Sequence, residues 1–206
     1  MMHVKGHVIS YLPSFLVEKF GRYGMDMWMY SLSKQAYDIY SDGVDKNGWY
    51  PLDVALTSPM DIVCETFYHN SLRGAIEFGR YVADKERSWE VRFFPIGRSL
   101  QSKLKKACIT LQSHYDSATI ISGTVNDDSA VIQVTHFPEN NEILEVINAG
   151  WIQRTLGQDG RHQVAIELKA QPENSSNLVY LVKLKKPEQE VIRTNMKMKK
   201  YLGFLY

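Results

Sequence analysis

Hydrophobic positions recur at helical spacing through the first half of the chain and alternate in much of the second half. Between residues 12 and 20, Leu and Phe return every three or four positions, which predicts an amphipathic helix. Similar stripes predict further helices over 25–39, 51–68, 71–87 and 99–118. The first half of the chain is therefore expected to be mainly helical.

Four short segments after residue 117 show the period of two that is typical of strands, and a short strand is also expected over 4–11, where His3 and His7 would share one face. A helical pattern over 138–157 separates the four later strands into two pairs, 118–125 with 130–137 and 162–170 with 177–185. The pattern predicts an α+β fold: an N-terminal helical subdomain followed by a ββαββ antiparallel four-stranded sheet.

The length suits one domain over residues 1–186, with a helical part over 1–116 and the ββαββ part over 117–186. Residues 187–206 restart a helical pattern after Pro187, with basic and aromatic positions side by side. This segment is expected to be a tail or connector. It could contact a signalling partner or a second copy of the chain, or dock on its own domain.

Composition narrows the function classes. The net charge of +1 gives no general attraction to nucleic acid, so no nucleic-acid partner is expected. Cys64 and Cys108 are too few for a disulfide framework and predict two buried thiols in a reducing compartment. No window is apolar enough for a membrane span, and the N-terminus lacks a secretory pattern. The sequence therefore predicts a cytoplasmic protein.

The sequence contains none of the common catalytic motifs. There is no glycine-rich phosphate loop, no Gly-x-Ser-x-Gly turn and no zinc spacing of cysteines or histidines. Carboxylates are scattered, so no acid–base pair is marked, and the pair of His3 and His7 is interpreted as incidental. We therefore expect a protein that is not an enzyme.

His114 is the one candidate metal ligand that the helical pattern brings near an apolar stripe. At about 100° per residue it returns to the edge of the stripe formed by Leu104, Cys108 and Leu111. The sequence "SHYDS" around it also indicates a helix end, where a histidine bonds to terminal carbonyls. A cap or core role is the main interpretation of His114, and a metal-ligand role is the alternative.

Several stretches resemble known sequences in collinear order. The opening "KGHVISYLPSFLVEKFGRYGMDMW" and "EFGRYVAD" resemble haem nitric oxide/oxygen binding (H-NOX) domains. "GWYPLD", "HYDSAT" and "THFPENNEILEVINAGWIQRTL" resemble a bacterial group related to that fold and to the 4-vinyl reductase (V4R) small-molecule-binding domain. The resemblance covers about Val4 to Lys185 and implies an H-NOX-like fold of the haem-free, V4R-related branch.

The resemblance also implies where a haem would be held, and the required residues are missing. In H-NOX domains a histidine on the long helix binds iron, and the matching position here is Leu111. The Tyr-x-Ser-x-Arg motif for the haem propionates falls near "VTHFPENN", which has no Tyr, Ser or Arg. We therefore expect no cofactor, and an apolar cleft between helices and sheet lined by Leu104, Cys108 and Leu111.

Three hypotheses follow. The first is a non-catalytic sensory domain without haem, which binds a small apolar ligand and signals to a partner through the C-terminal helix. The second is a haem-based gas sensor that uses His114 as the iron ligand. The third is an enzyme of the V4R-related branch, which rests on likeness of fold alone.

Overall fold

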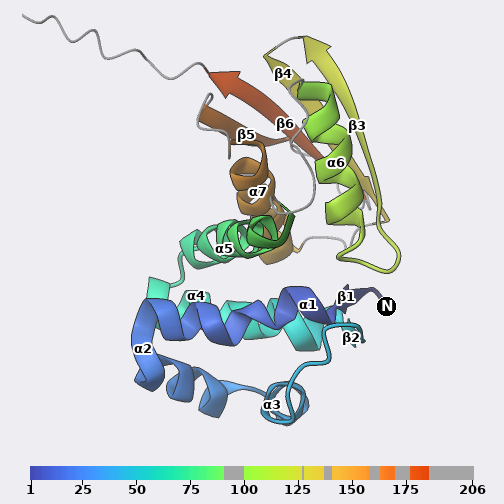
Figure 1. Ribbon diagram of the computed structural model, residues 1–206. Helices are drawn as coiled ribbons and strands as arrows, with labels where there is room; N and C mark the ends of the chain where they lie inside the picture. Colours follow the sequence, from blue (N-terminus) through green and yellow to red (C-terminus); the bar gives the residue numbers. More distant parts are fainter. Residues whose placement is uncertain (91–99, 127, 137–140, 158–162, 170–176, 186–206) are drawn as a thin grey trace, which may run out of the picture.

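The computed structural model describes residues 1–90, 100–126, 128–136, 141–157, 163–169 and 177–185. The N-terminal part is a layer of helices with a two-stranded ribbon at one end, and the C-terminal part is an antiparallel sheet covered by helices (Figure 1). A mixed fold of helices and antiparallel strands, as the hydrophobic pattern predicted, is confirmed. The predicted tail over 187–206 lies outside the described residues.

The chain begins with a strand that is much shorter than the sequence pattern suggested. Strand β1 covers only His3–Lys5 and pairs with β2, Trp49–Pro51. A four-residue helix, α1, then occupies Gly6–Ile9. Residue 6 is a glycine at a close backbone approach: a Cβ there would lie only 1.9 Å from the carbonyl oxygen of Asp45, so no side chain fits. The strand predicted over 4–11 was therefore wrong beyond Lys5, and His7 lies on a helix.

The helices predicted from the apolar stripes over 12–20 and 25–39 are present, but they begin and end at other residues. Helix α2 runs through Tyr11–Ser31 with a kink at Gly21, whose φ of 71° is left-handed. Helix α3, Lys34–Ser41, starts separately because the Ser33 side chain caps the backbone N–H of Ala36. The single helix predicted over 25–39 is therefore two helices.

The segment predicted as one helix over 51–68 divides in a different way. Residues Asp53–Thr57 form a π-helical turn, η1, which leads directly into α4, Ser58–Tyr68. Pro59, the second residue of α4, has no N–H to donate, and the carbonyl oxygen of Ala55, four residues earlier, accepts the Tyr40 hydroxyl instead. The helix therefore continues in sequence as expected, with a local change in its winding.

Helices α5, α6 and α7 join the helical layer to the sheet. Helix α5, Arg73–Glu90, lies between the N-terminal helices and the sheet (Figure 1). Helix α6, Leu100–Gln112, packs on β3. Helix α7, Glu142–Gly157, packs on β5. The strands β3, β4, β5 and β6 cover Thr119–Asn126, Ser129–Thr135, Gln163–Lys169 and Leu178–Lys185.

In the described residues these strands form an antiparallel sheet in the order β3-β4-β6-β5. Side chains of β4 and β6 alternate between the helix-covered face and the other face, as the period of two requires. The buried set is Ala130, Ile132, Val134, Leu178, Tyr180 and Val182. One face of the sheet therefore completes the core.

Helices α5 and α7 cross at backbone contact distance. A Cβ on Gly79 would lie 2.0 Å from the carbonyl oxygen of Ile147, and a Cβ on Gly150 would lie 2.3 Å from that of Ile76. Only glycine allows two helix backbones to approach this closely. This crossing fixes where the C-terminal end of α5 points.

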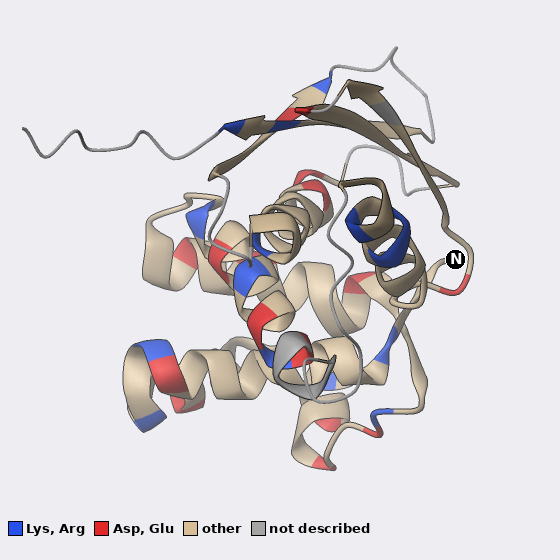
Figure 2. Cartoon of the chain, turned by 45° about the horizontal axis from the view of Figure 1, so that its top comes forward, with Lys and Arg blue, Asp and Glu red and all other residues tan. Residues whose placement is uncertain are grey.

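Charged positions of both signs are interspersed over the helices, in keeping with the net charge of +1 (Figure 2). Both cysteines are buried free thiols, which confirms the prediction for Cys64 and Cys108. Within the described residues, no helix combines the length and the apolar composition needed to cross a membrane.

Candidate functional site: a polar cluster between the helical layer and the sheet

The three residues predicted to line an apolar cleft all face the core. Leu104, Cys108 and Leu111 are 1%, 6% and 1% exposed. Burial raises the pKa of the Cys108 thiol, so this sulfur stays protonated near neutral pH. Their role as pocket lining stays a prediction.

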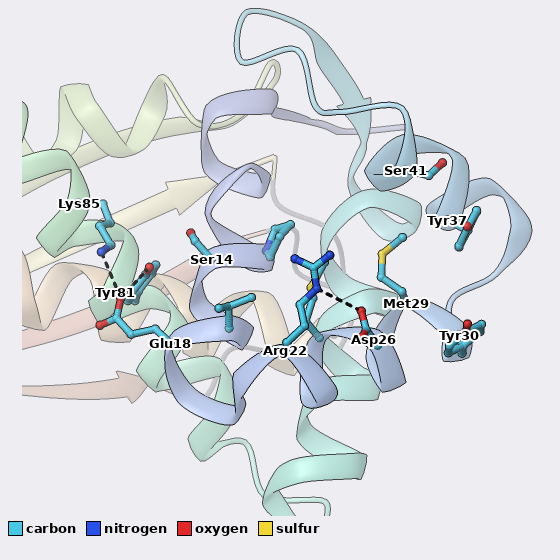
Figure 3. Close-up of a pocket in the computed structure, with 13 residues that line it drawn as sticks. Ser14, Glu18, Arg22, Asp26, Met29, Tyr30, Tyr37, Ser41, Tyr81 and Lys85 are labelled. Atoms are coloured by element: carbon cyan, nitrogen blue, oxygen red, sulfur yellow. Dashed lines mark hydrogen bonds and ion pairs between the residues drawn. The ribbon is translucent and has the colours of Figure 1, made fainter.

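A surface pocket of about 780 Å³ lies elsewhere, along the outer side of α2 (Figure 3). Apolar and charged side chains alternate around it, including an Arg22–Asp26 ion pair and the Glu18 carboxylate, which is paired with Lys85. The charged side chains named here are therefore paired with each other as ion pairs. The pocket walls also include Val17, Met25, Met29, Tyr30, Tyr37 and Tyr81.

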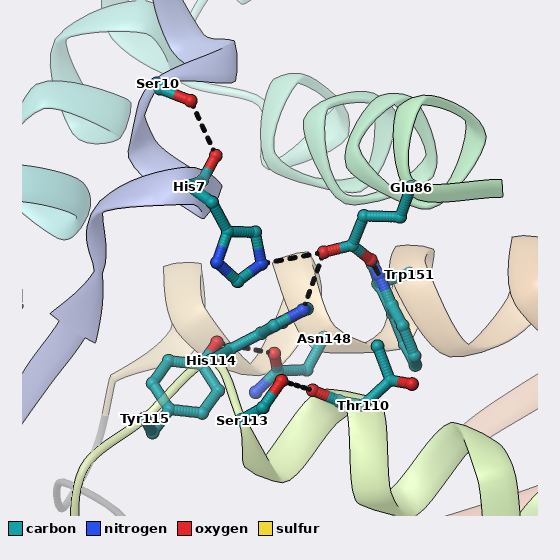
Figure 4. Close-up of polar contacts among 9 residues, drawn as sticks. All are labelled: His7, Ser10, Glu86, Thr110, Ser113, His114, Tyr115, Asn148 and Trp151. Carbon is teal, nitrogen blue, oxygen red and sulfur yellow. Dashed lines mark hydrogen bonds and ion pairs between the residues drawn. The ribbon is translucent and has the colours of Figure 1, made fainter. Parts of the chain in front are cut away.

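Three groups able to bind metals meet at the junction of the helical layer and the sheet-bearing part (Figure 4). The Oε1 atom of Glu86 lies 3.0 Å from His7 Nε2 and 2.9 Å from His114 Nε2. The other carboxylate oxygen, Oε2, accepts a 2.7 Å hydrogen bond from the indole N–H of Trp151. We call His7, Glu86 and His114 the junction triad.

Each member of the junction triad comes from a different element. His7 lies in α1, directly after Gly6, and Glu86 lies near the C-terminal end of α5, seven residues after Gly79. His114 lies two residues beyond the end of α6. The chain there is tied to β1, because the Lys5 N–H donates to the His114 carbonyl at 2.8 Å and Val4 bridges to Tyr115.

The Glu86 carboxylate is held ionised although it is largely enclosed. Its side chain is 13% exposed. Burial alone would raise the pKa of the Glu86 carboxyl. The charge of His114 and the hydrogen bonds from His114, His7 and Trp151 lower it by more, so the pKa lies well below its usual range. A carboxylate only accepts hydrogen bonds, so each imidazole directs an Nε2–H at it in this arrangement.

Aromatic rings surround the His114 imidazole, which is 2% exposed. The ring makes edge contacts with His7 and with Trp151, both at 5.3 Å between centroids. The neighbouring Tyr115 hydroxyl donates a 2.7 Å hydrogen bond to Asn148 Oδ1, and burial raises the Tyr115 pKa. His114 is therefore a buried, hydrogen-bonded core residue, which is one of the two roles in the main interpretation from the sequence.

Comparison with known proteins finds likeness to solved structures alone. No family model matches the sequence, and no curated protein matches it significantly. The unliganded Fe(II) H-NOX protein from K. algicida superposes with a TM-score of 0.67 at 9% identity, covering 89% of this chain and 98% of that chain. The chain has the H-NOX fold.

Two other H-NOX structures give similar values. The S. oneidensis protein in the Fe(II)NO ligation state has a TM-score of 0.66 at 10% identity, covering 88% of this chain and 99% of that one. A mutant of the T. tengcongensis H-NOX protein has a TM-score of 0.62 at 13% identity, covering 89% of this chain and 99% of that one. At identities this low, the TM-scores show likeness of fold alone.

A haem on this fold would need an axial ligand from Leu111 or His114. Leu111, at the position implied for the axial histidine, offers no ligand atom. The alternative ligand, His114, already has its Nε2 atom against Glu86, with the rings of His7 and Trp151 on either side. An iron porphyrin on that nitrogen would have to displace Glu86. In this arrangement the described residues do not fit a haem bound through His114.

The junction triad is the part of the site that the sequence failed to reveal. The scattered carboxylates marked no partner for a histidine, and His7 was placed on a strand beside His3. The structure separates them: His3 pairs with Asp116 at 2.7 Å, while His7 joins Glu86. The sequence marked no carboxylate as a partner for a histidine, and the structure brings Glu86 to two of them. The available signal was Glu86 itself, a charged position on the α5 face that also carries Val82 and Ala83.

Proposed function

We propose that this chain is a sensory domain on the H-NOX fold that works without haem. The observation that carries the proposal is the Glu86 carboxylate, which lies where an iron atom on His114 would have to be. The solved structures with this fold include a protein in an Fe(II)NO ligation state, so ligand-dependent signalling is the activity that the fold suggests. Leu111 and the missing propionate motif support the absence of haem independently.

The site lies where a signal could pass between the two parts of the molecule. The junction triad joins α1, α5 and the segment after α6, and Trp151 adds α7. A change in the position of Glu86 would therefore act on the helical layer and on the helices that cover the sheet together. Transfer of that change to a partner or a second copy through residues 187–206 is part of the proposal, as is an apolar ligand near Leu104, Cys108 and Leu111.

Absorbance spectroscopy tests the proposal. The chain is purified from cells supplied with a haem precursor, and haem is also added to the purified protein. We expect no Soret band above that of free haem, in the wild type and in the control variant His69→Asn, which changes an exposed histidine outside the junction triad. Native mass spectrometry of the same sample reports any bound small molecule and the number of subunits.

The alternative function, a haem sensor that uses His114, predicts the opposite result. A Soret band that survives purification and is lost in His114→Ala while His69→Asn keeps it would overturn the proposal. In that case Glu86 would have moved away from His114 to make room for the porphyrin. The third hypothesis, an enzyme of the V4R-related branch, rests on likeness of fold alone.

A further inference from the structure

The geometry points to a non-haem metal site: the junction triad of His7 Nε2, Glu86 Oε1 and His114 Nε2 binds one divalent first-row transition ion. This inference rests on the proposed function, because the triad stays assembled only if no porphyrin displaces Glu86. The metal site also goes beyond the proposed function, because it names the class of ion that the junction triad binds. The ligand set is two imidazoles and one carboxylate from three separate elements.

The distances suit a shared ion. Two donor atoms that each lie about 2.1 Å from one ion are separated by about 3.0 Å at right angles and by about 3.4 Å at the tetrahedral angle. The structure has separations of 3.0 Å for His7 Nε2 to Glu86 Oε1 and 2.9 Å for His114 Nε2 to the same oxygen. All three ligand atoms lie within 4.8 Å of one another. Because both Nε2 atoms point at Oε1, an ion bound to the two imidazoles takes nearly the place of that oxygen, and the Glu86 carboxylate must move back by about 1–2 Å to become the third ligand.

The chemistry of the donors selects the class of ion. Imidazole nitrogen is a good ligand for Zn²⁺, Fe²⁺, Co²⁺ and Ni²⁺, whereas Mg²⁺ and Ca²⁺ prefer sites made of oxygen atoms alone. A set of two histidines and one carboxylate leaves coordination positions open for water or a small ligand. The site would thus give the domain a place for a small exchangeable ligand without a porphyrin.

Proton balance is simple in this site. In the metal-free state each Nε2 carries the proton that it donates to Glu86. On binding, a neutral imidazole transfers its proton to Nδ1 and coordinates through Nε2, while an imidazolium loses one proton to water. The carboxylate remains ionised throughout, and no oxidant or reductant takes part.

The surroundings hold the ligands in place before an ion arrives. The Trp151 indole N–H fixes the second oxygen of Glu86 at 2.7 Å, which orients the carboxylate. The backbone bond from Lys5 to His114 holds the histidine beyond α6 next to the start of α1. His7 is 29% exposed at its side chain, so the triad has one open side through which an ion can enter.

The main test is titration of the tag-free, chelator-treated full chain with Co²⁺ as an optical probe, followed by Zn²⁺ and by Fe²⁺ under anaerobic conditions. We expect one ion per chain, with a rise in melting temperature that Mg²⁺ does not produce. His7→Gln and Glu86→Gln should each weaken binding by more than about 100-fold, beyond the effect of changes outside the ligand set. His69→Asn, the matched control, should leave affinity unchanged.

A second measurement needs no variant and covers the case in which a substitution unfolds the protein. The ring-nitrogen resonances of all histidines are followed by NMR as Zn²⁺ is added to the wild type. The inference requires the Nε2 signals of His7 and His114 to shift together at one equivalent. Shifts at His3, His69 or His136 instead, or binding equally weakened in His69→Asn, would overturn it.

The two proposals fail in different ways. If the protein binds neither haem nor a metal ion, the metal site is excluded while the haem-free domain stands. If it shows a Soret band that depends on His114, both are excluded. If Co²⁺ binds with the expected dependence on His7 and Glu86 and no Soret band forms, both are supported.

Discussion

The two halves of α5 meet their neighbours in opposite ways. At Gly79 the backbone of α5 contacts the carbonyl oxygen of Ile147 in α7, with no side chain or charge between them. Seven residues later, Glu86 brings a carboxylate into a largely enclosed place and must find three hydrogen-bond donors there. The first contact holds the fold together. The second is a charge that is costly to bury and depends on its three donors for stabilisation, which is the pattern expected of a functional group.

The largest expected effect belongs to the close crossing. Gly79→Ala places a Cβ 2.0 Å from the Ile147 carbonyl oxygen, and because that atom belongs to a helix backbone the two helices must separate. We expect a loss of about 3 kcal/mol of unfolding free energy, measured by chemical denaturation. Gly123→Ala is the control, because a Cβ there has no neighbour within 4 Å. Equal stability of the two variants would show that the crossing is not tight.

Removal of the carboxylate comes second. In chelator-treated protein, Glu86→Leu leaves His7, His114 and the Trp151 N–H without their shared acceptor, and we expect a loss of about 2–3 kcal/mol. Glu86→Gln keeps one acceptor oxygen and should cost about half as much. If Glu86→Leu were more stable than the wild type, the cluster would be held for function alone and the stability part of the comparison would be wrong.

The two histidines should differ in the same metal-free assay. His114 is 2% exposed at its side chain and His7 is 29% exposed. Water can replace part of the hydrogen bond at the more exposed residue, so His7→Gln should cost about 1 kcal/mol and His114→Gln about 2 kcal/mol. Thermal unfolding followed by circular dichroism gives the order. The reverse order would mean that His7 is the anchored member of the junction triad.

The smallest effect concerns Glu77, a carboxylate of the first half of α5. Burial would raise its pKa, but hydrogen bonds from Lys19, Arg73 and Tyr68 outweigh burial and lower the pKa from its ordinary value of 4.5. Its contribution to stability is therefore present above that value and is lost as the pH falls through the lowered pKa. Glu77→Gln should lose under about 1 kcal/mol near neutral pH and depend less on pH in acid, as denaturation at several pH values would show. A variant with the wild-type pH dependence would exclude Glu77 as a source of acid sensitivity.

The helices and strands could largely be predicted because their signals are local. The alternation in β4 and β6 and the stripes of α2, α5 and α6 each follow from neighbours a few residues apart. One error fell where distant backbone decides: the chain at Asp45 passes so close to Gly6 that no side chain fits there. The other has a local cause, because the Ser33 side chain caps a new helix at the N–H of Ala36.

The candidate site could be predicted only in part. His114 was recognised because it returns to the apolar stripe of its helix, and Leu111 because it stands in the position that a resemblance assigns to histidine. His7 carries no such local mark, and Glu86 is marked only as a charged position on the face of Val82 and Ala83. Their partners lie 28 and 79 residues away along the chain, so no spacing rule relates them.

Residue type and short-range periodicity specify most of the helices and strands, a mainly helical first half, and the absence of a histidine at position 111. The meeting of His7, Glu86 and His114 has a different origin, because it needs the folded chain. It depends on the glycine-mediated approach of α5 to α7 and on the pairing of the segment after α6 with β1. Both are packing events between distant segments, and a buried charge finds its partners only after the chain has closed around it.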